Sequence, residues 1–273
     1  MNLIVTTAQK PSPDVIRLAN DIAARLCVQF IPRNSHSLAT IREKYEVCDL
    51  IVVASNGPII HTAAGEYFFH LSMAELRIKN LINGKHDHMV IAMGLEAGMS
   101  VLDCTLGLAT DAIVASFVAG ETGIVTGLES SQVIALITGY GLQNFTVDSE
   151  ADITSALRRV KVENAEYCQY LEELPDNSFD IVYFDPMFRN PIYKSSNVNP
   201  IRTLANMSPL TPEAIRQACR VAKQKVVVKE AVGSSEFARL GLFTVVGGKY
   251  SSIKYGVIDC RPKMAGGGQP WNA

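Results

Sequence analysis

The sequence predicts an α/β fold, in which a small α/β unit precedes a large domain built on a mostly parallel sheet. From Met99 onward, short apolar stretches rich in β-branched residues alternate with longer helical stretches. This alternation is the pattern of a parallel sheet with helices on both faces. With 273 residues, 48% of them hydrophobic, the chain is long enough to bury one large core and a smaller second one.

Residues 1–65 are expected to form the small N-terminal α/β domain. Its expected elements, in chain order, are a strand near 3–7, a helix from Ser12 or Pro13 to Leu26, a strand at 28–31, a short helix near 37–45, and strands at 50–54 and 59–62. Residues 66–98 are expected to be linking helices. Ser72-Met73-Ala74-Glu75 has the spacing of a capping box, and Gly84 suits the end of the helix that would follow.

Residues 99–262 are expected to form the large domain, and 263–273, with three consecutive glycines, a flexible tail. The last two strands of this domain are separated by Gly247-Gly248 and should form an antiparallel pair that closes the sheet. The seven expected strands are 101–104, 124–129, 160–165, 180–185, 225–230, 243–246 and 253–258.

Composition narrows the class of protein. No segment approaches the roughly 18 uninterrupted apolar residues of a membrane helix, so we expect a soluble, cytoplasmic protein. The six cysteines include no CxxC pair, which argues against a zinc knuckle and a disulfide framework. His86-Asp87-His88 lacks a third ligand at a recognisable spacing, so no metal is expected.

Charge is distributed unevenly along the chain. Residues 1–184 hold 12 Lys and Arg against 22 Asp and Glu, a net charge of −10, whereas residues 185–273 hold 13 against 5, a net charge of +8. Either a local phosphate-binding face or a scattered solvated surface gives this count. Arg189, Lys194 and Arg202 favour the phosphate-binding face, because they closely follow a candidate catalytic motif.

That motif is Asp185-Pro186-Met187-Phe188, directly after the apolar run at 181–184. Ligands of open α/β sheets bind at the carboxyl ends of the strands. The Asp185 carboxylate and the Pro186 carbonyl offer acceptors for the two hydrogens of an exocyclic amine, and Phe188 offers a ring on which the base can stack. An ordinary Asp-Pro turn is the alternative for this tetrapeptide taken alone.

A second constellation follows the first strand of the large domain. Asp103, Thr105 and Gly107 belong to a turn of small residues that leads into a helix, where a ligand can approach the backbone closely. Glu129 ends the next strand, where the ribose hydroxyls of a nucleotide are held in dinucleotide folds. The GxGxxG fingerprint is missing, and Asp103 suits the ammonium of a methionine group better than a pyrophosphate.

The segments VLDCTLGLATDA, GLESS, VYFDPMF and VVVKE resemble the class I S-adenosylmethionine-dependent methyltransferases. They resemble most closely the family that methylates a guanine exocyclic amine in small-subunit ribosomal RNA, over about residues 66–260. The resemblance implies a Rossmann-like, seven-stranded methyltransferase sheet, S-adenosyl-L-methionine as cofactor and RNA as substrate. The sequence departs from that family at Ala109, where a glycine is usual, and at Arg189, where a second proline is usual.

The resemblance also assigns residues. Thr110 and Asp111 would contact the cofactor, Glu129 and Ser130 its ribose, and Tyr167 and Cys168 its adenine side. Asp185 would lie between the cofactor and the target base. With Pro186 and Phe188 it makes up the expected catalytic set, and the expected substrate contacts are Met187, Arg189, Lys194 and Lys229.

Other functions are less well supported by the residues. A nicotinamide-dependent oxidoreductase would share the fold, but the missing GxGxxG argues against it. A methyltransferase for DNA, a protein or a small molecule, and a non-catalytic S-adenosylmethionine-binding protein, remain open alternatives. His70 and Arg77 suit either a phosphate or cofactor-carboxylate contact or a structural role.

Overall fold

The large domain contains the expected seven-stranded sheet, which confirms the fold class. The structure is a computed structural model that describes residues 2–147, 151–186 and 204–261. In spatial order the strands are β11 (Thr244–Val246), β12 (Ile253–Asp259), β10 (Ala222–Ala231), β9 (Phe179–Phe184), β6 (Ser100–Asp103), β7 (Ile124–Leu128) and β8 (Val160–Glu163). All neighbours pair in parallel except those of β12, which pair antiparallel.

Both faces of this sheet are buried. Successive residues of each central strand point to opposite sides, and apolar side chains occupy both sides. Val101 and Ile181 are register partners within one hydrophobic cluster, whereas their successors Leu102 and Val182 belong to another. The first cluster packs under α3 (Ala74–Ile82), α4 (His88–Met93), α5 (Thr110–Ala119) and α7 (Ala151–Arg159); the second packs under α8 (Tyr167–Glu173), α10 (Pro212–Val221) and α11 (Glu236–Arg239). None of the described helices is long and apolar enough to cross a membrane.

The N-terminal unit has a sheet of its own. Its strand order is β2 (Gln29–Phe30), β1 (Leu3–Thr7), β3 (Asp49–Ala54), β4 (Gly57–Thr62) and β5 (Gly65–Tyr67), and its helices are α1 (Pro13–Leu26) and α2 (Leu38–Tyr45). Strand β5 extends this sheet to Tyr67, past the expected boundary at 65. The Ser12 side chain accepts a hydrogen bond from the Val15 amide, which fixes the start of α1.

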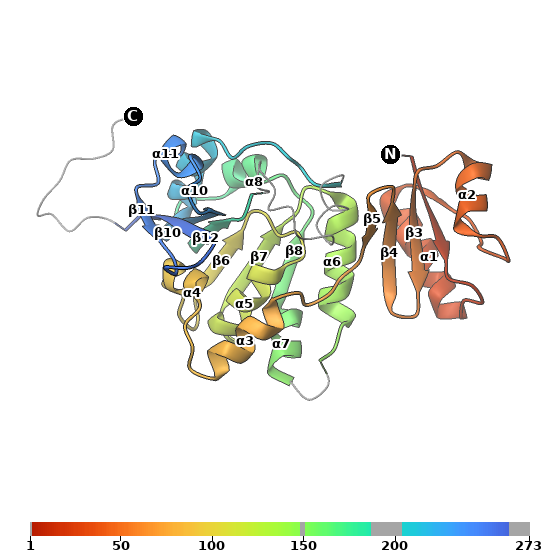
Figure 1. The fold of residues 1–273 in the computed structure, drawn as a ribbon, viewed down its shortest axis with the longest axis horizontal. Coiled ribbons are helices and arrows are strands. Elements are labelled where there is room, and N and C mark those ends of the chain that lie inside the picture. Colours follow the sequence, from red (N-terminus) through yellow and green to blue (C-terminus); the bar gives the residue numbers. More distant parts are fainter. Residues whose placement is uncertain (1, 148–150, 187–203, 262–273) are drawn as a thin grey trace, which may run out of the picture.

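The N-terminal sheet stands beside α6 (Gln132–Asn144) of the large domain (Figure 1). Buried side chains of α1 and β1 share one hydrophobic cluster with Val133 and Ile137 of α6. Two glycines permit this close contact: the ring of Phe69 lies directly against Gly141, and the ring of Tyr140 against Gly57. The two sheets are therefore joined through a common core.

One local expectation was wrong. The Ser72 side chain does not cap the linking helix, because α3 begins at Ala74 and its N-cap residue is Met73, which makes no side-chain capping bond. Ser72 has a left-handed backbone, with φ of 51°, and lines the large pocket described below. The expected flexible tail, 263–273, lies outside the described residues.

Substituting alanine at two positions of α6 should have opposite effects on stability. Gly141→Ala is expected to lower the free energy of unfolding by about 1–3 kcal/mol, because its Cβ would overlap the Phe69 ring. Gly139→Ala is the matched control: its Cβ would meet Val162 at 3.8 Å, an ordinary contact, and should add up to about 1 kcal/mol of helix propensity. Urea unfolding measures both, and equal effects would contradict a tight interface at Gly141.

Candidate functional site

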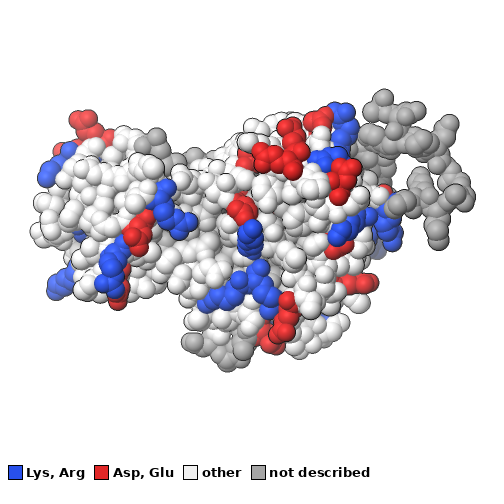
Figure 2. All heavy atoms as spheres, turned by 180° about the vertical axis from the view of Figure 1, so that it is seen from behind, with Lys and Arg blue, Asp and Glu red and all other residues white. Residues whose placement is uncertain are grey.

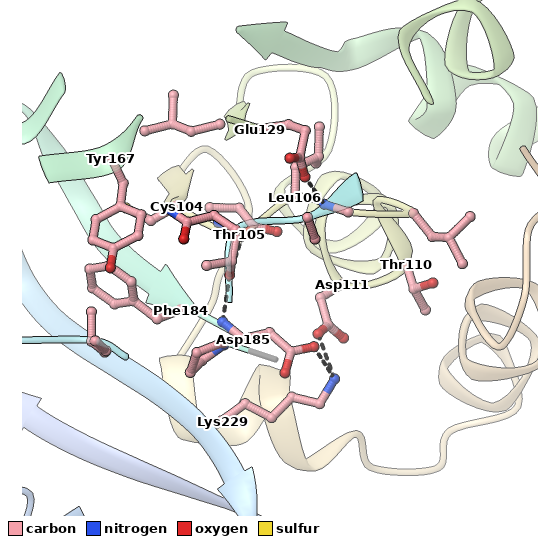
Figure 3. A pocket seen from close by; sticks show the side chains of 18 of the residues that line it. Cys104, Thr105, Leu106, Thr110, Asp111, Glu129, Tyr167, Phe184, Asp185 and Lys229 are labelled. Carbon is pink, nitrogen blue, oxygen red and sulfur yellow. Dashed lines mark hydrogen bonds and ion pairs between the residues drawn. The ribbon is translucent and has the colours of Figure 1, made fainter. Parts of the chain in front are cut away.

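A pocket of about 640 Å³ lies at the carboxyl ends of β6, β7 and β9 (Figure 3). Parallel strands end at the same edge of a sheet, so the polar residues that follow them are brought together there. The pocket is lined by most of the residues that the sequence pointed to: Asp103, Thr105, Gly107, Thr110, Asp111, Glu129, Ser130, Tyr167, Asp185, Pro186 and Lys229.

The turn after β6 is tied to the motif after β9 by Thr105. One oxygen of Asp103 accepts hydrogen bonds from the Thr105 amide at 3.0 Å and from its hydroxyl at 3.4 Å. The Thr105 hydroxyl in turn accepts a bond from the Asp185 amide at 2.6 Å. The backbone at Asp185 is thus fixed relative to Asp103 by a single side chain.

Gly107 and Glu129 form the second part of the pocket wall. Gly107 has a left-handed backbone with φ of 49°, and a Cβ there would meet nothing within 4 Å, so the backbone is open to a ligand. The buried Glu129 carboxylate accepts the Gly107 amide at 3.2 Å and the Ser131 amide at 2.8 Å. Burial raises the pKa of Glu129, while these two bonds act against the rise. An ionised carboxylate has further acceptor sites for the hydroxyls of a ribose.

The N-terminal sheet supports this turn from below. The Gly107 carbonyl accepts the Thr138 hydroxyl of α6 at 2.8 Å, and that hydroxyl lies 2.7 Å from the Tyr67 hydroxyl of β5. Ala109, which caps α5, has a left-handed backbone with φ of 61°. A β-carbon in that conformation costs roughly 1 kcal/mol, which gives a physical reason why a glycine would suit the position.

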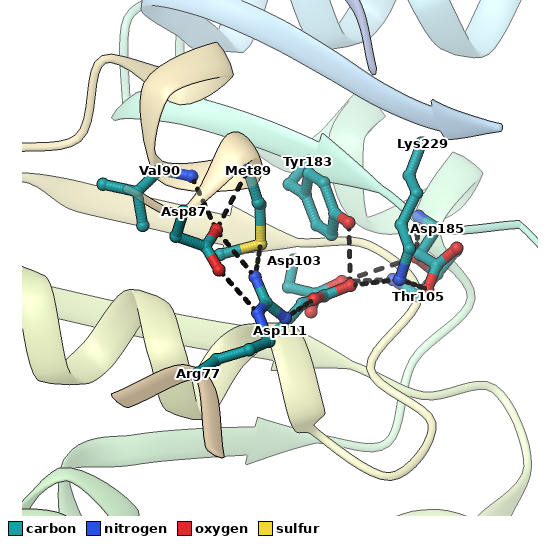
Figure 4. Close-up of polar contacts among 10 residues, drawn as sticks. All are labelled: Arg77, Asp87, Met89, Val90, Asp103, Thr105, Asp111, Tyr183, Asp185 and Lys229. Carbon is teal, nitrogen blue, oxygen red and sulfur yellow. Dashed lines mark hydrogen bonds and ion pairs between the residues drawn. The ribbon is translucent and has the colours of Figure 1, made fainter. Parts of the chain in front are cut away.

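A largely buried network of alternating charges, here called the charge network, forms part of the pocket wall (Figure 4). Asp111 of α5 is bound by Arg77 of α3, by Lys229 of β10 at 2.9 Å and by the Tyr183 hydroxyl at 2.8 Å. Lys229 also binds Asp185 at 2.7 Å. At the far end, Arg77 binds Asp87, whose carboxylate caps α4.

The charge network and burial move the carboxylate pKa values in opposite directions. Burial alone would raise the pKa of Asp111, but Lys229 and Arg77 outweigh it and hold that pKa well below its ordinary value. Burial raises the pKa of Asp103 to about 8, because only the Thr105 amide and a more distant Lys229 act against it. Burial also raises the pKa of Asp185, to about 6, although Lys229 lowers it. The Asp185 side chain is 30% accessible and lines the pocket.

Cys168 is an expected site residue that lies outside the pocket lining, and Lys229 has partners that the sequence did not predict. Tyr167 packs edge to face against Phe184 at the pocket wall, with 5.6 Å between ring centroids, whereas Cys168 does not line the pocket and its amide binds Glu166. The Lys229 ammonium, expected at a substrate phosphate, lies between two carboxylates. The expected substrate contacts Met187, Arg189 and Lys194, and the stacking residue Phe188, lie outside the described residues.

Sequence reasoning did not find the partners of several residues of the site. It left Arg77 with either a phosphate or cofactor-carboxylate contact or a structural role, and the structure pairs Arg77 with Asp87 in the charge network. The described residues hold no group of three or more side chains that could bind a metal. Tyr183 of β9 and Tyr67 of β5 reach the site through their hydroxyls, and the sequence predicted neither contact. No local sequence pattern marks such contacts, because each joins residues far apart in the chain.

The fold and the pocket define a class I S-adenosylmethionine-dependent methyltransferase. In the strand order, β6, which ends in Asp103, lies between β7, which Glu129 follows, and β9, which Asp185 follows. The pocket residues suit the cofactor: Asp103 can bind an ammonium, Glu129 can accept ribose hydroxyls, and Gly107 leaves room for close approach.

Comparisons with known proteins support the assignment to the S-adenosylmethionine-dependent methyltransferases. Residues 66–239 match a family described as "Putative SAM-dependent methyltransferase", and the chain belongs to this family. It is 36% identical over 260 residues to "Uncharacterized protein YpiP" of Bacillus subtilis, covering 95% of this chain and 100% of that one.

Two further likenesses are more limited. The chain is 33% identical over 135 residues to ribosomal RNA small subunit methyltransferase J of Thioalkalivibrio sulfidiphilus, over 48% of this chain and 51% of that protein. The crystal structure of the SAM-dependent methyltransferase NGO1261 from Neisseria gonorrhoeae has a TM-score of 0.62 and 16% identity, covering 93% of this chain and 94% of that one. The second likeness supports the fold alone.

Removing the buried Asp103 charge should stabilise the cofactor-free protein. A folded-state pKa of about 8 lies above the ordinary value of 3.8, so the stability that Asp103 contributes is complete below the ordinary pKa and is lost as pH rises toward 8. The free energy of unfolding of Asp103→Asn should therefore exceed that of the parent protein by an amount that grows by up to about 1.4 kcal/mol per pH unit between about pH 5 and 8. Urea unfolding across this range measures it.

The matched control is Asp21→Asn, on the exposed face of α1. The difference in unfolding free energy between Asp103→Asn and Asp21→Asn should widen over the same pH range. A difference between the two variants that stays the same at every pH would contradict a raised pKa at Asp103.

Proposed function

We propose that the protein transfers the methyl group of S-adenosylmethionine to the exocyclic amine of a base in RNA, with guanine of small-subunit ribosomal RNA as the favoured target. The observation that carries this proposal is the placement of Asp185 and Pro186 in the cofactor pocket, at the end of β9. The partial likeness to an enzyme named as a ribosomal RNA methyltransferase supports the choice of RNA.

We assign the cofactor-side residues first. Asp103 binds the ammonium of the methionine group, Glu129 binds the ribose hydroxyls, and the open backbone at Gly107 allows the close approach that both contacts need. Tyr167 forms the apolar wall on the adenine side. The bound cofactor supplies a methyl group made electrophilic by its sulfonium.

Asp185 and Pro186 are assigned to the amine. The lone pair of an aromatic amine is delocalised into the ring, so acceptors that hold its two hydrogens direct the lone pair toward the methyl carbon. Lys229 occupies Oδ2 of Asp185, which leaves Oδ1 for one hydrogen, and the Pro186 carbonyl accepts the other. The nitrogen–carbon bond forms as the carbon–sulfur bond breaks, and the amine then loses one proton, which Asp185 takes up and passes to solvent.

Lys229 is assigned a positioning role in this scheme. Its ammonium binds Asp111 and Asp185 together, so it fixes the Asp185 carboxylate against the end of α5. It also favours the ionised form of Asp185, the form that accepts hydrogen bonds from an amine. Preorganising acceptors in this way contributes to the rate through orientation.

Asp185→Ala is expected to reduce methyl transfer by about 100-fold or more while leaving cofactor affinity within a few-fold, because it removes an acceptor for the amine but no assigned cofactor contact. The assay is tritiated-methyl transfer, in parallel, to total RNA, DNA and protein from cells lacking the protein, with nucleoside analysis of labelled RNA for N-methylguanine. Asp185→Asn is the milder variant, since its amide oxygen can still accept. Label found only in DNA or protein would overturn the RNA proposal, and normal transfer by Asp185→Ala would overturn the assignment of Asp185.

Lys229→Met should move the acid limb of the kcat–pH profile to higher pH. Without the ammonium, the pKa of Asp185 rises further above about 6, so the ionised acceptor forms only at higher pH. Lys229→Arg keeps the charge and should keep the profile near its original place. Lys225→Met is the matched control on the same strand, because the Lys225 ammonium donates to the Ala92 carbonyl and does not line the pocket. An unmoved acid limb in a folded Lys229→Met protein would refute the positioning role.

A further inference from the structure

The segment 247–252, here called the β11–β12 loop, lies at the mouth of the pocket. Val246 pairs with Tyr255, and Ile253 pairs with Ala231 at the carboxyl end of β10, so the loop stands at the sheet edge where the site is built. Ser251 of the loop lines the pocket together with Ile253, which follows it. Ser72 and Met73, before α3, line the same pocket.

The β11–β12 loop is held in place by several interactions. The Lys254 ammonium donates to the Gly247 carbonyl at 3.3 Å and to the Gly248 carbonyl at 3.0 Å. The Ser251 amide closes a turn onto the Gly248 carbonyl at 3.1 Å. Gly248 also lies against the His88 imidazole, which leaves no room for a Cβ. The two residues at the tip are therefore presented in a defined place.

Those two residues are Lys249 and Tyr250. Tyr250 is 92% exposed, the largest value among the large hydrophobic side chains that the structure describes. The Lys249 ammonium lies over the Tyr250 ring, 5.5 Å from its centroid. An aromatic ring held in water with a cation beside it contributes nothing to the core, so its placement calls for a different explanation.

Lys249 also differs from the other described cations after Asp185. Six of them form ion pairs with carboxylates: Arg216, Arg220, Lys223, Lys229, Arg239 and Arg261. Lys225 and Lys254 donate to backbone carbonyls. Among the described cations of this basic half, Lys249 differs in that its ammonium lies over an aromatic ring.

Positive and negative side chains lie close together over much of the surface. In Figure 2, Lys and Arg side chains are interspersed with Asp and Glu over the visible face, among large uncharged areas. Most of the positive charge counted in residues 185–273 is therefore balanced locally where the structure describes it. A cation at the pocket mouth that has no carboxylate partner remains available to a phosphate.

We propose that Lys249 and Tyr250 form a docking surface for the single-stranded RNA that flanks the target nucleotide; this rests on the proposed function. The Tyr250 ring stacks on a neighbouring base and the Lys249 ammonium binds an adjacent phosphate. Stacking on an aromatic ring tolerates any base, so this surface contributes affinity and places the target nucleotide over the pocket. A ring and a cation at one site fit a nucleotide strand better than the mixed surface of a protein.

The test is tritiated-methyl transfer, in parallel, to total RNA, DNA and protein from cells lacking the protein, with KM for RNA, kcat, the Kd for S-adenosylmethionine and Tm measured for each variant. Tyr250→Ala should raise KM for RNA about tenfold, and Tyr250→Phe, which keeps the ring, should stay within about twofold. Lys249→Gln should raise KM and reduce its dependence on log salt concentration by about one. Cofactor affinity and Tm should be unchanged, because both side chains are exposed.

Phe243→Ala is the matched control. Phe243 is 82% exposed but precedes β11 at the opposite end from the loop, so its loss should leave KM unchanged. If the parent protein labels RNA and Tyr250→Ala has an unchanged KM, the docking surface is wrong while the proposed function stands. If the parent protein labels DNA or protein and not RNA, the proposed function fails first and the docking surface with it.

Discussion

The buried carboxylate of Asp111 is the constraint on which the rest of the site depends. A buried charge is tolerated only when it is paired and hydrogen-bonded, and Asp111 has partners from three directions: Arg77 of α3, Lys229 of β10 and Tyr183 of β9. These partners belong to the linking segment and to two strands of the sheet. Satisfying this one carboxylate therefore fixes the linking helices against the core and sets the position of Lys229, which in turn holds Asp185.

The charge balance of the site follows from the same arrangement. Four carboxylates, those of Asp87, Asp103, Asp111 and Asp185, share two cations, Arg77 and Lys229. Asp103 is the carboxylate without an adjacent cation in this set. Its nearest partner is the Thr105 amide, and burial raises its pKa to about 8. A ligand that carries positive charge relieves this imbalance, and S-adenosylmethionine carries both an ammonium and a sulfonium. The pocket is thus electrostatically matched to its cofactor before any specific contact is considered.

The sequence predicted the parts of the site that depend on single strands. Asp103, Glu129 and Asp185 each follow an apolar run, and the parallel pattern alone brings their strand ends to one edge. It could not predict contacts between side chains that are distant in the chain. The Lys229 ammonium, which the sequence predicted as a substrate contact, also binds Asp111, 118 residues away. Ser72 has the spacing of a helix cap, but the pocket-lining turn that it forms overrides this local signal.

The N-terminal sheet also contributes to the site, although its sequence carries no obvious catalytic motif. Its last strand, β5, places the Tyr67 hydroxyl against Thr138, whose hydroxyl binds the carbonyl of Gly107. Phe69 then packs on Gly141 one turn further along α6. A buried hydroxyl pair that lost either member would leave a polar group unsatisfied, so the sheet cannot shift relative to α6 without disturbing the cofactor turn. The N-terminal sheet therefore supports the Gly107 backbone, which we propose that the cofactor approaches closely.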